Sequence, residues 1–216
     1  MSLNLSENIC PTKYPKLRRF PVGKMPVGKE DAIMPMEDAK DVFRQHVIIE
    51  EKMDGKDAVI DADRFRLFMN DMKITHTICY RIPARFVVFD IFDKHRTVFL
   101  SREEKESVFG SIQKNVIKLE NFNSYHFFLA PLISSGMYTF EDLPGFIGLS
   151  KYAINRDTKA QGYMEGVVVK PDHDTFLFEL EHLSGKLVRE EFTKGITANY
   201  LEKPIRFNLI NPSFEV

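Results

Sequence analysis

The sequence predicts an α+β fold in which helices are inserted among mostly antiparallel strands, and two observations support this class. Short runs rich in β-branched and aromatic residues follow one another from His46 to Phe92, separated by charged or turn-forming residues. Stretches with helical character lie before and after these runs, and no internal repeat is evident. At 216 residues the chain is long enough for one sizeable core and short for two full domains. We therefore expect one compact domain.

Residues 1–30 are expected to form an irregular basic arm that precedes a single domain at residues 31–216. Prolines and repeated glycines in this stretch disfavour both helix and strand. Between Pro11 and Lys29 the segment is basic and contains no acidic residue. Such a segment is either a solvated arm or a surface that contacts phosphates. The candidates for nucleic-acid contact in this arm are Lys16, Arg18 and Arg19.

The first half of the domain is expected to begin with a short helix at about residues 36–45. A series of short runs with β character follows, and charged or turn-forming residues bound each run. The expected strands are His46–Lys52, Lys56–Asp61, Arg64–Met69, Ile74–Ile82 and Arg85–Phe92.

The second half is expected to combine two helices with further strands. Ser101 and Glu104 have the spacing of a capping box, which predicts a helix from there to about residue 118. Residues 126–133 read as a buried strand, and residues 140–149 as a helix with Pro144 and Gly145 in its interior. The β pattern then returns at residues 162–171, 175–181 and 186–192.

Composition and charge exclude several classes of protein. The N-terminus lacks an apolar signal core and no stretch of 18 uncharged apolar residues is present, so we expect neither secretion nor a membrane span. The two cysteines are far apart and support neither a disulfide framework nor a zinc site. An intracellular protein, cytoplasmic or nuclear, is expected. The net charge of −1 gives no overall attraction to nucleic acid.

Three motifs carry the candidate chemistry. Lys52-Met53-Asp54-Gly55 follows the first apolar run, and an Asp-Gly pair alone is typical of a hairpin turn. The quartet is followed by EGVVVK, which is Glu165 to Lys170, and by KLVREEF, which begins at Lys186, 16 residues after Lys170 (186 minus 170). Three such elements in this order favour a site over a turn.

The residue types in these motifs fit the transfer of a phosphate group. A lysine attacks phosphorus only as the neutral amine, and nearby cations favour that form. Lys170 and Lys186 can stabilise the negative charge of a reacting phosphate. Glu165 is a candidate ligand for Mg²⁺, and Asp90 in FVVFDIFD is a candidate second carboxylate.

The three motifs resemble those of the covalent nucleotidyltransferase superfamily of polynucleotide ligases and messenger-RNA capping enzymes. In that superfamily the lysine of Lys-x-Asp-Gly, motif I, takes up a nucleoside monophosphate as a phosphoramidate. FVVFDIFD resembles motif III, EGVVVK motif IV and KLVREEF motif V, so the resemblance covers about residues 46–192. It implies an α+β nucleotidyltransferase domain with antiparallel sheets flanking a nucleotide cleft.

Within the superfamily the sequence is most similar to ATP-dependent RNA ligases of the type 2 kind. Glu51 precedes the lysine, as does a glutamate that contacts adenine in those enzymes, and motif V ends in acid-Phe at Phe192. After Phe192 only 24 residues remain (216 minus 192), too few for an appended oligonucleotide-binding fold of roughly 80 residues. The resemblance implies ATP and Mg²⁺ or Mn²⁺ as cofactors. It also implies RNA or nicked nucleic acid as the substrate. A partner chain could supply the nucleic-acid-binding part that an appended oligonucleotide-binding fold would otherwise provide.

The resemblance assigns roles to residues at matching positions. The catalytic residues are Lys52, Lys170 and Lys186. Glu165 and Asp90 are the metal ligands. The nucleotide-binding residues are Glu51, Lys52, Asp54, Gly55, Asp90, Glu165, Lys170 and Lys186. Arg189, after motif V, joins the candidates for nucleic-acid contact.

Three positions depart from the pattern of RNA ligases. Asp90 stands where motif III normally has glutamate, Val188 where motif V has a second lysine, and Met69 where an arginine is expected after motif I. ATP-dependent DNA ligase and GTP-dependent capping enzyme stay open as alternatives within the superfamily. A catalytically degenerate module that binds nucleotide or nucleic acid is the alternative from a different class, and the departures at Met69 and Val188 lend weight to it.

Overall fold

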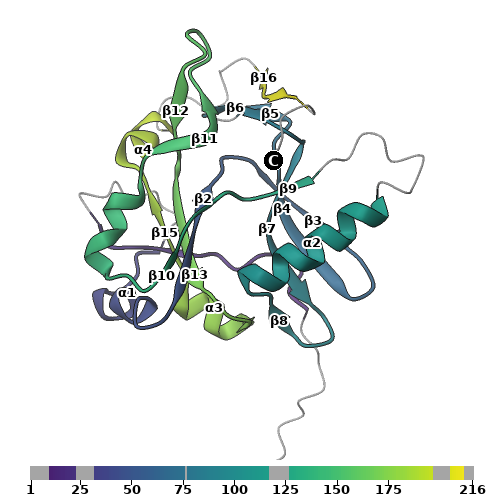
Figure 1. Cartoon of the computed structure of the whole chain (residues 1–216). Helices are drawn as coiled ribbons and strands as arrows, with labels where there is room; N and C mark the ends of the chain where they lie inside the picture. Colours follow the sequence, from purple (N-terminus) through teal and green to yellow (C-terminus); the bar gives the residue numbers. More distant parts are fainter. Residues whose placement is uncertain (1–9, 23–31, 76, 117–126, 197–204, 212–216) are drawn as a thin grey trace, which may run out of the picture.

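The structure is a computed structural model, and it describes residues 10–22, 32–75, 77–116, 127–196 and 205–211. Two large sheets and two small ones form the described part of the chain. Figure 1 shows the two large sheets side by side, with α2 running across one of them. The helices are α1 (Met36–Val42), α2 (Arg102–Val116), α3 (Leu177–Leu183) and α4 (Glu190–Ile196), with a 3₁₀ helix η1 (Phe140–Phe146).

Sheet I has five strands, in the order β1-β15-β13-β2-β10. All neighbours pair antiparallel except β1 and β15, which run parallel. The strands of sheet I are β1 (Arg18–Arg19), β15 (Gly185–Val188), β13 (Gly166–Pro171), β2 (Val47–Lys52) and β10 (Leu132–Gly136).

Sheet II has the order β14-β8-β7-β4-β3, and β9 adds to β7 in parallel. The β3-β4-β7 part is an antiparallel meander. The strands of sheet II are β14 (Thr175–Phe176), β8 (Val98–Phe99), β7 (Phe86–Asp93), β4 (Phe65–Asp71), β3 (Lys56–Asp61) and β9 (Phe127–Leu129).

Two small sheets flank the large ones. The strand order of the larger is β12-β11-β6-β17, and the smaller is the pair β16-β5. Their bounds are β12 (Gln161–Tyr163), β11 (Leu149–Ile154), β6 (Cys79–Ile82), β17 (Leu209–Ile210), β16 (Arg206–Phe207) and β5 (Ile74–Thr75). The α+β class with mostly antiparallel strands is confirmed. No helix in the described ranges is long and apolar enough to span a membrane.

Side-chain alternation along β2 explains how sheet I can carry both a core and a site. Val47 and Ile49 point to one face, where they join the core formed with α1, η1 and the apolar positions of β13. Ile48, Glu50 and Lys52 point to the opposite face, because successive residues of a strand alternate. The outer face of sheet I is therefore apolar core, and its inner face carries charged side chains.

Several expected elements differ from the observed ones. Residues 175–181 were expected to be a strand, but only Thr175–Phe176 pairs and helix α3 begins at Leu177. The strand expected at 186–192 ends at Val188 and gives way to α4. The strand expected at residues 126–133, of which 127–133 are described, is divided in two: β9 pairs with sheet II, whereas β10 pairs with sheet I.

The ends of the predicted helices differ as well. Ser101 Oγ accepts a hydrogen bond from Glu104 N at 3.3 Å, as a capping box requires. The reciprocal bond is absent from the described contacts, because Ser101 N donates to Asp174 instead. Residues 117–118 of this expected helix lie outside the described residues. The helix expected at residues 140–149 is only the 3₁₀ helix η1 (Phe140–Phe146), which includes Pro144, and Leu149 already belongs to strand β11.

The N-terminal segment is not irregular throughout. Arg18–Arg19 form strand β1 against β15, and Phe20 is fully buried in the core of sheet I. The rest of residues 1–30 is described only from residue 10 to 22. The described part of the basic arm is thus integrated into the domain by sheet pairing and by core packing.

Candidate active site

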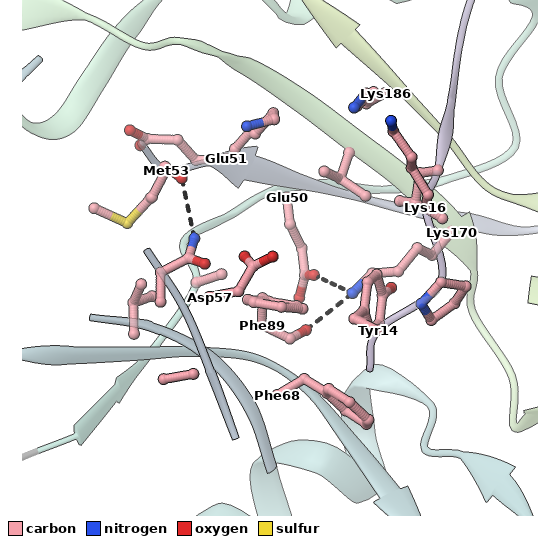
Figure 2. A pocket seen from close by; sticks show the side chains of 18 of the residues that line it. Tyr14, Lys16, Glu50, Glu51, Met53, Asp57, Phe68, Phe89, Lys170 and Lys186 are labelled. Atoms are coloured by element: carbon pink, nitrogen blue, oxygen red, sulfur yellow. Dashed lines mark hydrogen bonds and ion pairs between the residues drawn. The ribbon is translucent and has the colours of Figure 1, made fainter. Parts of the chain in front are cut away.

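A cavity of about 710 Å³ lies between the inner faces of the two large sheets (Figure 2). Strands β2, β13 and β15 of sheet I form one wall, and β3, β4 and β7 of sheet II form the opposite one. The volume is in the range of small-molecule and cofactor sites. Its charged lining residues are Lys13, Lys16, Glu50, Glu51, Lys52, Asp57, Lys170 and Lys186.

Lys52 is the last residue of β2 and forms a close ion pair with Glu165. Residue Gly166 on β13 is directly opposite Lys52 in the strand register, which places the preceding Glu165 beside it. Lys52 Nζ lies 2.5 Å from Glu165 Oε1, and the side chain of Lys52 is 27% exposed against 5% for Glu165. The sheet therefore brings motif I and motif IV together at the rim of the cavity.

Glu165 has the properties of a carboxylate that accepts a further ligand. Burial raises the pKa of Glu165 above its usual value, while the Lys52 ammonium opposes this shift. Its Oε2 atom is buried and has no hydrogen-bond partner among the described residues. A buried carboxylate oxygen left without a donor fits a divalent cation, and Mg²⁺ is often held by one or two carboxylates together with substrate phosphates. Among the described residues, no three His, Cys, Asp or Glu side chains are grouped so that together they could hold a metal ion.

The close pairing of β13 with β15 requires a glycine at position 166, directly after Glu165. A Cβ at this position would lie 2.1 Å from Leu187 O and 2.9 Å from Val188 Cα, both backbone atoms of β15. No rotation of a side chain can relieve that contact. The absence of a Cβ lets β13 and β15 pair closely enough to hold Lys186 opposite Val168.

Replacing Gly166 by alanine should destabilise the protein by about 3 kcal/mol, because the two strands must separate to admit the methyl group. The matched control is Gly110→Ala in α2, where a Cβ meets no atom within 4 Å. That substitution should stabilise the helix by about 0.5–1 kcal/mol. Urea unfolding of both variants measures the difference. Equal stabilities would show that β15 does not depend on this close approach.

Asp54 and Gly55 support the loop after Lys52 rather than facing the cavity. Asp54 Oδ2 accepts hydrogen bonds from Thr77 N at 2.7 Å and Ile78 N at 3.2 Å. Asp54 N donates to Tyr80 Oη at 3.0 Å. A Cβ on Gly55 would lie 2.8 Å from Asn70 Cβ, so glycine permits the loop to approach β4. The contacts of the two residues thus fix the position of the backbone next to Lys52.

Lys170 has three oxygen acceptors around its ammonium group. Lys170 Nζ lies 2.6 Å from Glu50 Oε2 and 3.1 Å from Asp90 Oδ2, and it donates to Phe89 O at 3.0 Å. Figure 2 shows the contacts to Glu50 and Phe89 as dashed lines. Burial alone would lower the pKa of Lys170, but the two carboxylates outweigh it and raise the pKa. The Lys170 ammonium is therefore charged, and the carboxylates of Glu50 and Asp90 neutralise its charge.

Asp90 is bound by a lysine and by a tyrosine. Its Oδ2 atom accepts a hydrogen bond from Tyr14 Oη at 2.5 Å, in addition to the contact with Lys170. Burial, and next the negative charge of Asp90, raise the pKa of Tyr14 well above its usual value, so the phenol is the donor. Asp90 and Glu165 thus have different partners. Binding of a metal by Asp90 stays a prediction, and a metal ion would have to compete with Lys170 and Tyr14 for the Oδ2 atom of Asp90.

Sequence reasoning missed Glu50, which is the centre of a buried charge network. Lys105 and Arg102, both from the first turn of α2, reach Glu50 Oε1 at 2.6 and 2.7 Å. Burial disfavours the charged form of Glu50, but Lys105, Lys170 and Arg102 together hold its pKa far below the usual range. Burial lowers the pKa of Lys105 to about 8 against the attraction of Glu50. The network ties α2 to both sheets.

Glu51 lines the cavity, but its carboxylate is engaged by the neighbouring strand β11. Ser150 Oγ donates to Glu51 Oε1 at 2.5 Å, and Lys151 N donates to Oε2 at 3.3 Å. Burial raises the pKa of Glu51, although both hydrogen bonds oppose the shift. Contact of Glu51 with a base stays a prediction.

The four residues expected to contact nucleic acid lie in different surroundings. Lys16 is exposed and lines the cavity. Arg18 forms an ion pair with Asp38 at 2.6 Å, at the side of α1. Arg189 donates to Met164 O at 3.0 Å, and its guanidinium lies 5.5 Å from the ring centroid of Tyr163. Arg19 pairs with Lys186 in the register of β1 and β15. Contact of these four residues with nucleic acid stays a prediction.

Comparison with solved structures finds this arrangement of sheets in an RNA ligase. A ligand-free structure of a variant of RNA ligase R4a from Naegleria gruberi matches 85% of this chain and 58% of its own, with 14% identity and a TM-score of 0.50. The chain shares the fold of this RNA ligase. A structure of the Naegleria RNA ligase with pyrophosphate matches 85% of this chain and 63% of its own, with 15% identity and a TM-score of 0.49.

A third match is a variant of the Naegleria RNA ligase with ATP and Mn, at 14% identity and a TM-score of 0.45. It covers 73% of this chain and 54% of its own. The chain thus spans between about half and two thirds of the length of these ligases. No protein-family model matches the sequence, and no curated protein matches it at a significant level.

Proposed function

We propose that the chain is an ATP-dependent RNA ligase that acts through a covalent lysyl-AMP intermediate on Lys52. The observation that carries the proposal is the Lys52–Glu165 pair at the rim of a cavity that Lys170 and Lys186 also line. The fold shared with an RNA ligase supports it independently of the motifs. In the proposed reaction AMP passes from Lys52 to the 5′-phosphate end of a strand, which is then joined to a 3′-hydroxyl end.

The first step of the proposed reaction has a clear assignment of bonds. Lys52 Nζ attacks the α-phosphorus of ATP, the N–P bond forms, and the P–O bond to the β-phosphate breaks. The electron pair leaves with pyrophosphate. Lys52 gives up two protons to solvent in all, one when the ammonium becomes the attacking amine and one after the N–P bond has formed. Lys186, on β15 and opposite Val168 of β13, supplies positive charge for the phosphate oxygens during this step.

Glu165 is the residue that would hold a divalent cation, because its Oε2 atom is buried and no donor of the described residues contacts it. A bound Mg²⁺ or Mn²⁺ would supply charge neutralisation for the carboxylate and for the phosphates. Glu165 itself orients Lys52 by the 2.5 Å contact at Oε1. Loss of that contact frees the amine for reaction.

The second candidate function is a module that binds nucleotide or nucleic acid without catalysis. The observation that favours it is the engagement of both central lysines: Lys52 by Glu165, and Lys170 by Glu50, Asp90 and Phe89 O. In the ligase reaction Lys170 must exchange one of these acceptors for a phosphate oxygen. In a binding module it need not.

Incubation with each α-labelled nucleoside triphosphate, followed by denaturing electrophoresis, separates these functions. We expect covalent label from ATP in the presence of Mg²⁺ or Mn²⁺, and none from GTP. Label from GTP alone would identify a guanylyltransferase of the capping type. No covalent label from any nucleotide, with binding of ATP retained, would identify the non-catalytic module. Assays for the joining of labelled RNA ends and of labelled DNA ends then show whether RNA or DNA is the substrate.

A further inference from the structure

The described N-terminal segment forms part of the cavity wall, and residues 13–17 line it. We call these five residues the strap. Figure 1 shows this purple segment running from sheet I to sheet II. The sequence suggested a solvated arm or a grip for nucleic acid, and neither reading accounts for a segment that forms part of a cavity wall.

Anchors on both sides hold the strap in place. Tyr14 Oη donates to Asp90 Oδ2 at 2.5 Å, and the Tyr14 ring centroid lies 4.9 Å from that of Phe89. Leu17 is buried, and Arg18 begins strand β1 and pairs with Asp38 at 2.6 Å. Lys16 lies between these anchors, and Lys13 directly precedes Tyr14. Both lysines are thus attached to an ordered backbone, which limits the entropy that a ligand contact must overcome.

The charged side chains that line the cavity differ in whether a side chain of opposite charge lies beside them. The carboxylate of Glu50 has three cationic partners, and Lys52 and Lys170 are paired with carboxylates. Lys13 and Lys16 are exposed, and within the described part of the chain neither has an ion-pair partner. Figure 2 shows Lys16 and Lys186 at the same end of the cavity. Lys13 and Lys16 therefore add positive charge to this end of the cavity, and no carboxylate of the described residues forms an ion pair with either of them.

We propose that Lys13 and Lys16 of the strap, together with Lys186, form a subsite for the β- and γ-phosphates of the nucleoside triphosphate. This inference rests on the proposed function, because the leaving group of the first step is pyrophosphate. The parallel pairing of β1 with β15, which sets Arg19 opposite Lys186, keeps the strap beside motif V. The strap then stabilises the charge that develops on pyrophosphate as the P–O bond breaks.

The test compares Lys13→Ser/Lys16→Ser with the control Lys40→Ser/Lys114→Ser. All four lysines are exposed, and both double variants lose two positive charges. Charge-assisted hydrogen bonds contribute roughly 1.5–3 kcal/mol each, which is about tenfold or more per lost contact. We expect the strap variant to require about 100-fold more ATP for half-maximal labelling of Lys52. Reversal of the adduct by pyrophosphate should need a similarly higher pyrophosphate concentration, and the control should behave as wild type.

A second measurement keeps the inference testable if wild-type protein forms no adduct, which would contradict the proposed function alone. Calorimetry with inorganic tripolyphosphate should show binding to the wild type and the control, weakened about 100-fold in the strap variant. Wild-type protein that does not bind tripolyphosphate would overturn the subsite. Unchanged ATP dependence in the strap variant, with weakened RNA binding, would overturn it as well and assign the strap to the nucleic acid. Thermal unfolding of both variants should match the wild type, since no described partner is lost.

Discussion

Lys52→Ala should abolish covalent labelling by ATP while the protein stays folded. The side chain is 27% exposed and its described ion pair is with Glu165, so its removal leaves little packing unfilled. Without the amine no N–P bond can form at this position, and Lys170 does not replace it, because its ammonium is enclosed by Glu50, Asp90 and Phe89 O. Electrophoresis of the labelled protein measures the effect directly.

Two companion variants control for charge and for location. Lys52→Arg should be equally inactive, because a guanidinium stays protonated at any working pH. Lys56→Ala, four positions later on the exposed strand β3, should label like the wild type. Label retained by Lys52→Ala would mean that another residue is the nucleophile.

Glu50→Gln should destabilise the protein by about 3–5 kcal/mol, the usual scale for breaking a buried ion pair by removing one partner. Glutamine keeps the size but leaves Lys105, Lys170 and Arg102 without their shared carboxylate. Glu106→Gln is the matched control, because Glu106 also pairs with Arg102 but is 52% exposed. That control should cost less than about 1 kcal/mol. Urea unfolding at neutral pH measures both variants.

The destabilisation by Glu50→Gln should also depend on pH. The cations hold the folded-state pKa of Glu50 below its unfolded value of 4.5, so the stabilisation is complete above that pH. As the pH falls below 4.5, the unfolded chain takes up the proton first, and the advantage of the wild type shrinks by up to about 1.4 kcal/mol per pH unit. A gap that stays constant from pH 7 to pH 3 would contradict the assignment of Glu50 as the centre of the network.

Local patterns were sufficient to predict the strands that carry the site. The runs predicted as strands at residues 46–52 and 162–171 contain β2 (Val47–Lys52) and β13 (Gly166–Pro171), and these two strands pair in the register that sets Gly166 opposite Lys52. The proximity of motif I and motif IV then follows from that register. What no local pattern could give is the register itself, because it depends on core packing of Val47 and Ile49 against α1 and β13.

The wrong strand prediction at residues 175–181 has a physical cause. Residues 175–181 alternate apolar and polar character over a run too short to distinguish a strand from a helix. A helix forms instead of a strand because Leu177 and Leu180, three residues apart, both pack against the cluster that contains Phe68 and Phe92. Glu179 also accepts a hydrogen bond from Phe176 N at 3.0 Å, which satisfies a backbone donor at the start of α3. Tertiary packing therefore decided the element.

The buried network around Glu50 was not predictable from the sequence in the same way. Its members Tyr14, Glu50, Asp90, Lys105 and Lys170 come from five separate segments, and their meeting depends on the whole fold. The weak signal was local: Glu50 is a charged residue inside an apolar strand, and such a residue needs a partner when buried. The strap escaped prediction for the reverse reason, since its prolines and charges suggested solvent.

Peptide mapping of the nucleotide adduct tests the central claim most directly. Protein incubated with ATP and Mg²⁺ is digested, and mass spectrometry locates the modified residue. The proposed function predicts one AMP on Lys52, joined through nitrogen and therefore released by acid. AMP found on a different residue, or no adduct in protein that binds ATP, would contradict it.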